Sequence, residues 1–256
     1  MQTLAIDLTS PWTPSSAMAV ASNKSADVLE SSSLLGRRPD MWYDPTVDLV
    51  YSIGGRSYIP NGQSSNPNVV PTLWGFKPQS NGSVNWMNQS STMNPQSTVL
   101  SSNIAGGLSA TSPTGHYNLG GCFVDAWDNS WALREMFSYN SANQSWYNLT
   151  LTMAEQYFTW GEAQYIPIYG AGGVILFFGG YLPSDTNVTS LDSLPMAALD
   201  TILVYDIHTN RFFKQPASNP PSARSLFCSV AVGASNNESY EMCVSPTLNS
   251  TTCAIL

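Results

Sequence analysis

The chain has 256 residues, of which 43% are hydrophobic and only 10% are charged, and its net charge is −8 at pH 7. The apolar content excludes a disordered chain, and the length suits one large all-β domain or two small ones. The nine Lys and Arg residues are scattered, so no cationic face for nucleic acid is visible, and no apolar run reaches the ~18 residues of a membrane span.

The predicted elements are short strands arranged in repeating units. Residues 4–12 predict only the outer hairpin of a unit. Three whole units of four strands follow, and a half unit comes after them. The whole units span 37–88, 104–150 and 163–216, and the last half spans 222–244. The tail, 245–256, resembles no strand of the repeat, so we expect it to be unstructured.

The third unit shows the pattern most clearly. Ile166–Tyr169 predicts its opening strand, and Gly170–Gly173 a turn. Val174–Phe178 is a run of five apolar residues that suits a strand buried on both faces. Thr201–Tyr205 predicts the next strand, and Asn210 lies in a tight turn where a positive φ is tolerated.

Each unit has a glycine pair after an apolar run, and two spaced aromatic residues later in the unit. The glycine pairs are Gly54-Gly55, Gly120-Gly121 and Gly179-Gly180. The aromatic pairs are Phe76 with Trp86, Tyr139 with Trp146, and Tyr205 with Phe212. An all-β unit that recurs every ~60 residues predicts an array of blades rather than a single sheet. We expect the glycines to allow close backbone approach or a bulge.

This order of strands, glycine pair and spaced aromatics resembles the kelch repeat. Over residues 4–244 the chain looks like the kelch-type propellers, or galactose-oxidase-like central domains, of many fungal secreted and membrane-anchored proteins. Segments 37–44 and 222–228 resemble the blade-opening segments of that group. The resemblance implies one all-β propeller domain over 1–256. The two half units either pair into a four-bladed ring or mark a fragment of a larger propeller, and we favour the fragment. A fragment would leave apolar edges open to aggregation.

Catalytic motifs are absent from the sequence: there is no G-x-S-x-G, H-E-x-x-H, C-x-x-C or P-loop. Galactose oxidase, within the resembled family, needs a copper site with two His and two Tyr. The two histidines here, His116 and His208, are expected to be surface or edge residues that do not converge on a metal. We therefore predict no catalytic residues, no metal and no cofactor.

The expected function is binding of a protein or a cell-surface glycan through loops, without catalysis. Loops 125–134 and 156–162 combine charges with three tryptophans, which are candidate binding residues: Trp127, Trp131 and Trp160. Packing at the blade rim is the alternative for these aromatics. The other hypotheses are a galactose-oxidase-like copper oxidase or glycan-active propeller, and a truncated product without its own function.

Indirect signals indicate the secretory pathway, although this chain has no signal peptide and the parent protein would be extracellular or a membrane-anchored ectodomain. The sequence contains eight N-glycosylation sequons, at Asn23, Asn81, Asn88, Asn143, Asn148, Asn187, Asn237 and Asn249. Four cysteines, at 122, 228, 243 and 253, are able to form two disulfides. The last four residues, Cys253–Leu256, also fit a prenylation box, which we attribute to chance.

Overall fold

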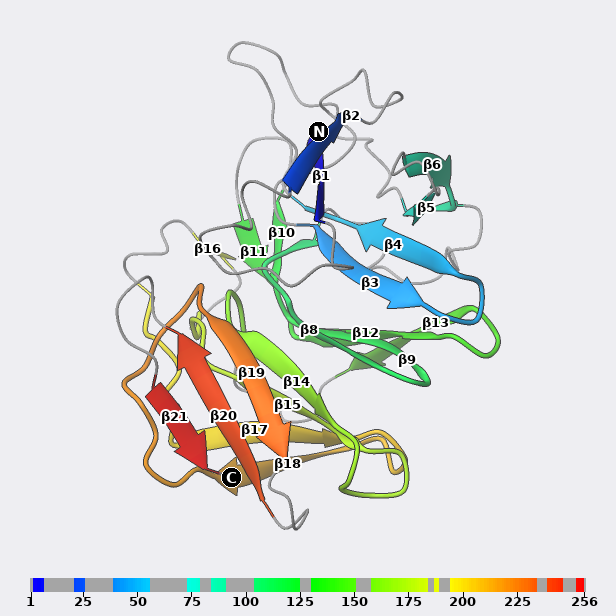
Figure 1. Cartoon of the computed structure of the whole chain (residues 1–256). Coiled ribbons are helices and arrows are strands. Elements are labelled where there is room, and N and C mark those ends of the chain that lie inside the picture. Colours follow the sequence, from blue (N-terminus) through cyan, green and yellow to red (C-terminus); the bar gives the residue numbers. More distant parts are fainter. Residues whose placement is uncertain are drawn as a thin grey trace.

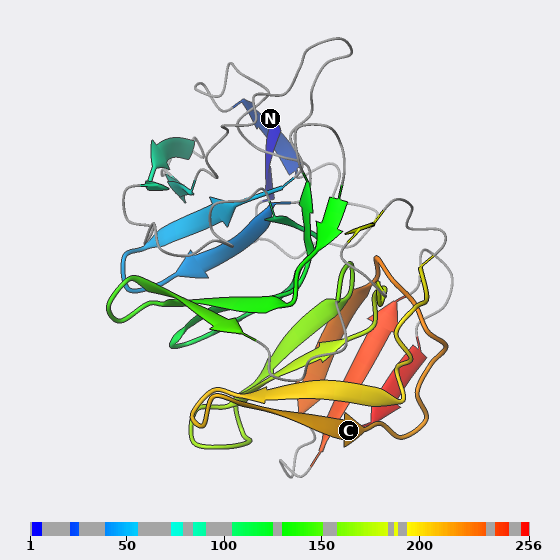
Figure 2. The same cartoon turned by 180° about the vertical axis from the view of Figure 1, so that it is seen from behind.

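Antiparallel sheets stand side by side around a common axis, in chain order from blue to red (Figures 1 and 2). The computed structural model describes residues 2–6, 21–25, 39–55, 73–78, 84–90, 104–124, 130–150, 158–183, 187–188, 194–233, 239–245 and 252–255. All regular elements named within these ranges are strands, so the fold is all-β and of the β-propeller type. No helix in this part of the chain is long and apolar enough to cross a membrane.

Four of the described sheets have four strands each, and in three of these the sheet order equals the chain order; we call these three sheets blades 1 to 3. Blade 1 contains β3 (Asp40–Asp44), β4 (Leu49–Ile53), β5 (Trp74–Pro78) and β6 (Val84–Asn88). Blade 2 contains β8 (Leu108–Ser112), β9 (Gly115–Leu119), β12 (Glu135–Asn140) and β13 (Ser145–Thr150). Blade 3 contains β14 (Glu162–Ile166), β15 (Val174–Phe178), β17 (Thr201–Asp206) and β18 (Arg211–Pro216).

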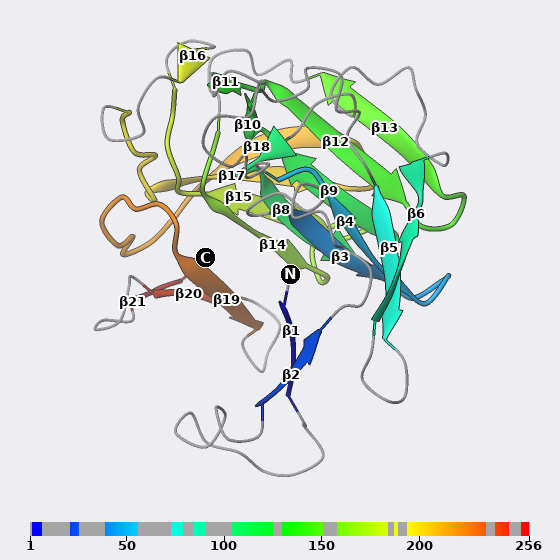
Figure 3. The same ribbon diagram turned by 90° about the horizontal axis from the view of Figure 1, so that it is seen from above.

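Blade 4 is three-stranded, and two further sheets complete the described structure. Blade 4 contains β19 (Cys228–Gly233), β20 (Tyr240–Ser245) and β21 (Thr252–Ile255). β1 (Gln2–Ile6) pairs with β2 (Ala21–Ser25). The other sheet joins β7 (Ile104–Ala105), β10 (Cys122–Val124), β11 (Ser130–Ala132) and β16 (Asn187–Val188). From above, β3, β8, β14 and β19 are the innermost strands of their blades (Figure 3).

The hydrophobic cores lie between neighbouring blades. Trp42 and Tyr51 of blade 1 pack against Phe137 and Tyr139 of blade 2. A second cluster joins the opposite face of blade 2 to blade 3, and a third joins blade 3 to blade 4. β15 is buried along its whole length, as its run of five apolar residues predicts, because it contributes one face to each of these last two clusters.

The spaced aromatics are cross-strand partners in the outer hairpin of each blade. Phe76 lies opposite Trp86, Tyr139 opposite Trp146, and Tyr205 opposite Phe212. Their ring centroids are 4.4, 5.1 and 4.9 Å apart, near the short end of the range of favourable aromatic contacts. In blade 3 the hairpin turn contains Asn210 with φ of 55°, as the sequence predicts.

Each glycine pair docks its blade onto the next one. The second glycine donates its N–H to a carbonyl that precedes the next inner strand: Gly55 to Ile104 (2.7 Å), Gly121 to Phe158 (2.8 Å) and Gly180 to Arg224 (2.8 Å). All six glycines have φ between 67° and 91°, a region that favours glycine. A Cβ on Gly54 or Gly120 would lie 2.3 Å from the acceptor oxygen of Ile104 or Phe158. The expected close backbone approach is confirmed.

Several expectations from the sequence need correction. Blade 3 opens at Glu162–Ile166 rather than Ile166–Tyr169, because Pro167 has no N–H for the ladder and the chain turns there. The tail, 245–256, is not wholly unstructured: Thr252–Ile255 forms β21, which pairs with β20. The partner of β1 is β2, at 21–25, whereas residues 7–12 of the expected 4–12 hairpin lie outside the described residues.

The cysteines also differ from the two-bridge expectation. Cys122 is free and buried, and Cys228 is free and exposed, whereas Cys243 is disulfide-bonded. The register of blade 4 places Cys253 directly opposite Cys243. The four cysteines therefore form one disulfide at most.

The docking glycines can be tested against a matched glycine. Gly120→Ala and Gly170→Ala both place alanine at a positive φ, 67° and 68°, but the nearest atom to the new Cβ is at 2.3 Å in the first and 3.5 Å in the second. We expect Gly170→Ala to lower the free energy of unfolding by about 1–2 kcal/mol, the cost of the backbone conformation. Gly120→Ala should cost at least about 2 kcal/mol more, because the blade contact must open. Urea denaturation measures both, and equal costs would contradict the docking role.

Candidate functional site

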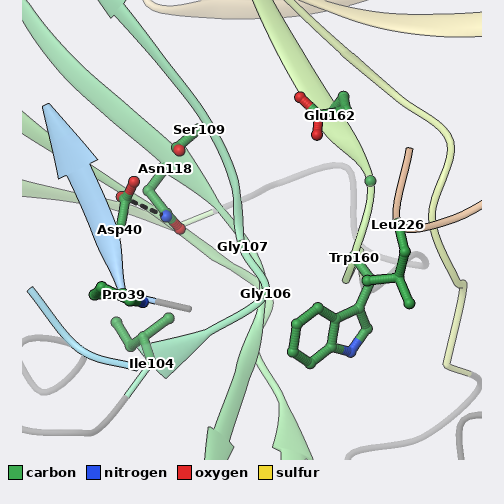
Figure 4. Close-up of a pocket in the computed structure, with 11 residues that line it drawn as sticks. Pro39, Asp40, Ile104, Gly106, Gly107, Ser109, Asn118, Trp160, Glu162 and Leu226 are labelled. Atoms are coloured by element: carbon green, nitrogen blue, oxygen red, sulfur yellow. Dashed lines mark hydrogen bonds between the residues drawn. The ribbon is translucent and has the colours of Figure 1, made fainter. Parts of the chain in front are cut away.

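A pocket of about 180 Å³ lies where the segments that enter the blades meet near the axis (Figure 4). We call 104–107, 158–161 and 224–227 the entry segments, because they immediately precede β8, β14 and β19. The pocket is lined by residues from these segments, by the first residues of β3 and β14, and by side chains from β8 and β9. It is therefore built from the inner ends of blades 1, 2 and 3 and from the segment that enters blade 4, which contributes Leu226.

The entry segments are joined by backbone hydrogen bonds. The Trp160 N–H donates to the Gly106 carbonyl at 2.7 Å, and the Leu226 N–H donates to the Trp160 carbonyl at 3.0 Å. These three residues occupy the same place in successive blades, and all have positive φ: 69°, 60° and 54°. The non-glycine members hold an uncommon conformation because the bonds on both sides fix it. Trp160 is thereby held in one place at the pocket.

One wall of the pocket is a buried polar network around Asp40. Asp40 Oδ2 accepts hydrogen bonds from His116 Nε2 and from Asn118 Nδ2, each at 2.7 Å. His116 also bonds Thr111 through Nδ1 at 3.0 Å and stacks on Trp42, with ring centroids 4.5 Å apart. Burial alone would raise the pKa of Asp40. The charge of His116, together with hydrogen bonds from His116, Ser109 and Asn118, nevertheless holds this pKa below its ordinary value. Asp40 is therefore an anchored carboxylate.

Asn118 brings an unused acceptor to the same wall. The side chain is 1% exposed, and its Oδ1 is buried without a hydrogen-bond partner within the described structure. Gly107 leaves room for this amide, since a Cβ there would lie 2.2 Å from Oδ1. A buried acceptor without a partner is costly, whereas the Nδ2 of the same amide is paired with Asp40.

The opposite wall carries Trp160 and Glu162, which Figure 4 shows across the pocket from Asp40 and Asn118. The six-membered ring of Trp160 lies against Gly106, where a Cβ would be within 2.8 Å of three ring atoms. Burial raises the pKa of Glu162 to about 7. At neutral pH this carboxyl is therefore divided between the protonated and ionised forms, and it can either donate or accept a hydrogen bond.

The lining favours a ligand that donates hydrogen bonds. The polar side chains on the pocket wall are Asp40, Ser109, Asn118 and Glu162, with no Lys or Arg among the residues that line it. An anion would meet carboxyl groups without a cationic partner, whereas a hydroxyl or ammonium group would meet acceptors. The volume is below the roughly 300 Å³ at which pockets for drug-sized ligands begin, so the pocket suits one sugar ring or one side chain.

The structure places the three tryptophans that were predicted to bind a partner in different settings. Trp160 lines the pocket. Trp131 lies in β11, opposite Phe123 and Asn187 in the neighbouring strands, and the placement of its side chain is not described. Trp127 lies outside the described residues. Whether the three act as one patch stays a prediction.

The two histidines lie in different blades. His116 is in β9 and only 1% exposed, so the expectation of a surface or edge histidine is wrong for it, because Asp40 and Thr111 satisfy both ring nitrogens inside the protein. His208 is exposed in the turn between β17 and β18. Within the described ranges, no group of three or more His, Cys, Asp or Glu residues is placed to hold a metal ion.

None of the sequon asparagines that the structure describes lines the pocket. Asn88, Asn143 and Asn148 are exposed, Asn23 lies in β2, and Asn187 begins β16. Asn81, Asn237 and Asn249 lie outside the described residues.

Sequence reasoning missed most of the pocket wall. Asp40, Ser109 and Asn118 are far from Glu162 in the chain, and only the docking of blades brings them together. A weak signal existed: Asp40 and Glu162 are each the first residue of an inner strand, so the first and third whole units carry a carboxylate at the same place. Loop 156–162 had already included Glu162 as a charge beside Trp160.

Comparison with known proteins shows the fold alone. No family model matches the chain, and no curated protein matches it. Among solved structures, the structure of YjhT, a β-propeller, is similar with a TM-score of 0.51 and 12% sequence identity. The similarity covers 90% of this chain and 67% of that chain.

Glu162 gives a testable pH dependence of stability. Folding raises its pKa from 4.5 to about 7, so the folded state retains a proton that the unfolded chain releases. Stability from this group is present below about pH 4.5 and is lost as the pH rises to about 7. When the pH is raised from 5 to 8, we expect the free energy of unfolding of Glu162→Gln to rise relative to that of the wild type by on the order of 1 kcal/mol. This value is reduced because the carboxyl is partly exposed. Urea denaturation at both pH values measures this, with Glu241→Gln, at an exposed carboxyl of β20, as the control. If the difference in free energy of unfolding between the wild type and Glu162→Gln does not change with pH, the raised pKa of Glu162 is contradicted.

Proposed function

We propose that this protein is a kelch-type β-propeller that binds a glycan without transforming it, and that the axial pocket takes one sugar residue. The observation that carries the proposal is the acceptor-rich lining formed by Asp40, Ser109, Asn118 and Glu162, which includes no Lys or Arg. Sugar hydroxyls supply the donors that such a lining would accept.

Trp160 supports a sugar over a partner's charged side chain. Aromatic rings pack against the apolar C–H faces of sugars, while the ring edge and neighbouring polar groups leave the hydroxyls to be bonded. A rigid, preformed tryptophan loses little entropy on binding, and the backbone bonds on both sides of Trp160 provide that rigidity. The sequence also suggests a protein partner, and the experiment below distinguishes a protein partner from a glycan.

The kelch relationship and the secretory location belong to the same proposal. The glycine pairs, with their shared positive φ and shared contact to the next blade, support a kelch-type unit. The disulfide at Cys243 supports folding in an oxidising compartment, because cytosolic proteins rarely retain structural disulfides. Surface glycans are ligands that a protein in that compartment would meet.

A glycan array with the purified chain tests the proposal. We expect binding to a restricted set of terminal sugars, and at least a tenfold loss of affinity in Trp160→Gly and in Glu162→Gln, equivalent to about 1.4 kcal/mol. Glycine is chosen at position 160 because it accepts the φ of 60°. Glu241→Gln should leave affinity unchanged. A blank array together with specific capture of a protein partner would exclude the glycan, and binding that both pocket variants retain would move the site elsewhere.

A glycan-active enzyme is the second candidate, and one observation favours it. Asp40 and Glu162 line the same pocket, and their pKa values shift in opposite directions. Such a pair is suited to base and acid roles. Against it, the oxygen Oδ2 of Asp40 is already held by His116 and Asn118.

Mass spectrometry of bound glycans separates the two candidates. We expect every array ligand to be recovered intact after prolonged incubation with the wild type. A product that forms with the wild type and not with Glu162→Gln would establish turnover, and the non-catalytic proposal would then be wrong.

A further inference from the structure

Every sequon in the described part of the chain lies on an edge strand or in the turn that enters one. Asn23 is in β2, Asn88 in β6, Asn148 in β13 and Asn187 in β16, and each of these strands pairs with one other strand among those that the structure describes. Asn143 is in the turn between β12 and β13. In contrast, Asn118 is in the interior strand β9, is buried, and is not part of a sequon.

The outer edges of blades 1 to 3 differ in charge, and among these three the sequons lie on the two strands that contain no charged residue. β6 (VNWMN) and β13 (SWYNLT) contain no charged residue, and both expose large apolar side chains, Met87 at 36% and Tyr147 at 47%. β18 (RFFKQP), the outer edge of blade 3, has no sequon but carries Arg211, Lys214 and Pro216. Charges and proline are established means of preventing an edge strand from pairing with another chain. β6 and β13 lack them and carry sequons instead.

The geometry of these sequons suits attachment. The Asn88 Oδ1 accepts the Ser90 N–H at 2.9 Å, and the Asn143 Oδ1 accepts the Ser145 N–H at 3.1 Å. Both are Asx-turns, which fold the hydroxyl residue of the sequon back toward its asparagine. The Asn148 Nδ2 donates to Glu135 Oε2 at 2.9 Å, and a second N–H on the same nitrogen is available for substitution. All three asparagines are exposed.

We propose that Asn88, Asn143 and Asn148 carry N-linked glycans that cover the outer edges of blades 1 and 2 and prevent strand pairing between molecules. The co-reactant is a lipid-linked oligosaccharide. The Nδ2 atom forms a bond to the anomeric carbon of the sugar, the bond from that carbon to the lipid diphosphate breaks, and the diphosphate leaves as Nδ2 loses one proton. Nothing in this proposal depends on what the axial pocket binds.

Peptide mapping of the chain secreted from a eukaryotic host tests occupancy. We expect glycans at all three asparagines. Unmodified Asn88 and Asn148 in the secreted protein would overturn the proposal, because these are the two sequons that lie within the uncharged edges.

A rescue experiment tests the role at the edge. The triple variant Asn88→Gln, Asn143→Gln and Asn148→Gln should form oligomers or precipitate at concentrations where the glycosylated wild type is monomeric by light scattering. Adding Met87→Lys and Tyr147→Lys should restore the monomer, because lysine gives β6 and β13 the protection that β18 already has. A triple variant that stays monomeric, or one whose association the lysines do not relieve, would overturn the edge role. Glycan binding at the axial pocket should be the same in the monomeric lysine variant as in the wild type.

Discussion

The hydrogen bond from the second glycine of each pair to the carbonyl before the next blade is the contact on which the rest of the structure depends. It recurs at Gly55, Gly121 and Gly180, with donor–acceptor distances of 2.7–2.8 Å. Because the preceding glycine presses against the same segment, neither backbone can move away without leaving buried polar groups unpaired. The bond fixes where each inner strand begins, and the interblade cores then pack against sheets that are already in register.

The pocket is a consequence of this docking. Entry segments held at a fixed distance by glycine contacts place Gly106, Trp160 and Leu226 in line, and the backbone bonds between them close the inner end of the blades. The first residues of β3 and β14 line the pocket that this arrangement leaves, so the polar side chains of Asp40 and Glu162 are accommodated there. The site is thus rigid for the same reason that the blades are aligned, which suits recognition by a preformed surface.

Local signals in the sequence predicted the parts of the fold that depend on a few neighbouring residues. The glycine pairs, the cross-strand aromatics and the turn at Asn210 all act through backbone conformation or contacts within one hairpin. The misplaced strand at Ile166–Tyr169 reflects too little weight on Pro167, which ends the ladder. β21 was missed because its four residues form a strand only against β20.

The candidate site was only partly predictable, for a different reason. Trp160 and Glu162 are neighbours in one loop, and an aromatic beside a charge is visible in the sequence. The bond between Asp40 and His116 joins residues 76 positions apart and exists only because blades 1 and 2 dock. No periodicity marks such a pair, since each residue alone is typical of an exposed strand end.

The inner and outer edges of each blade lie in different environments. The inner edge is covered by neighbouring blades, so it tolerates unusual φ values and buried polar groups that an isolated sheet would not. The outer edge pairs with no further strand among the described residues, so its free N–H and C=O groups must be kept from other chains by its own side chains or by what is attached to them. Substitutions on β6, β13 or β18 therefore act on association between molecules. Substitutions at the entry segments act on folding and on the pocket together, because the same backbone bonds hold both.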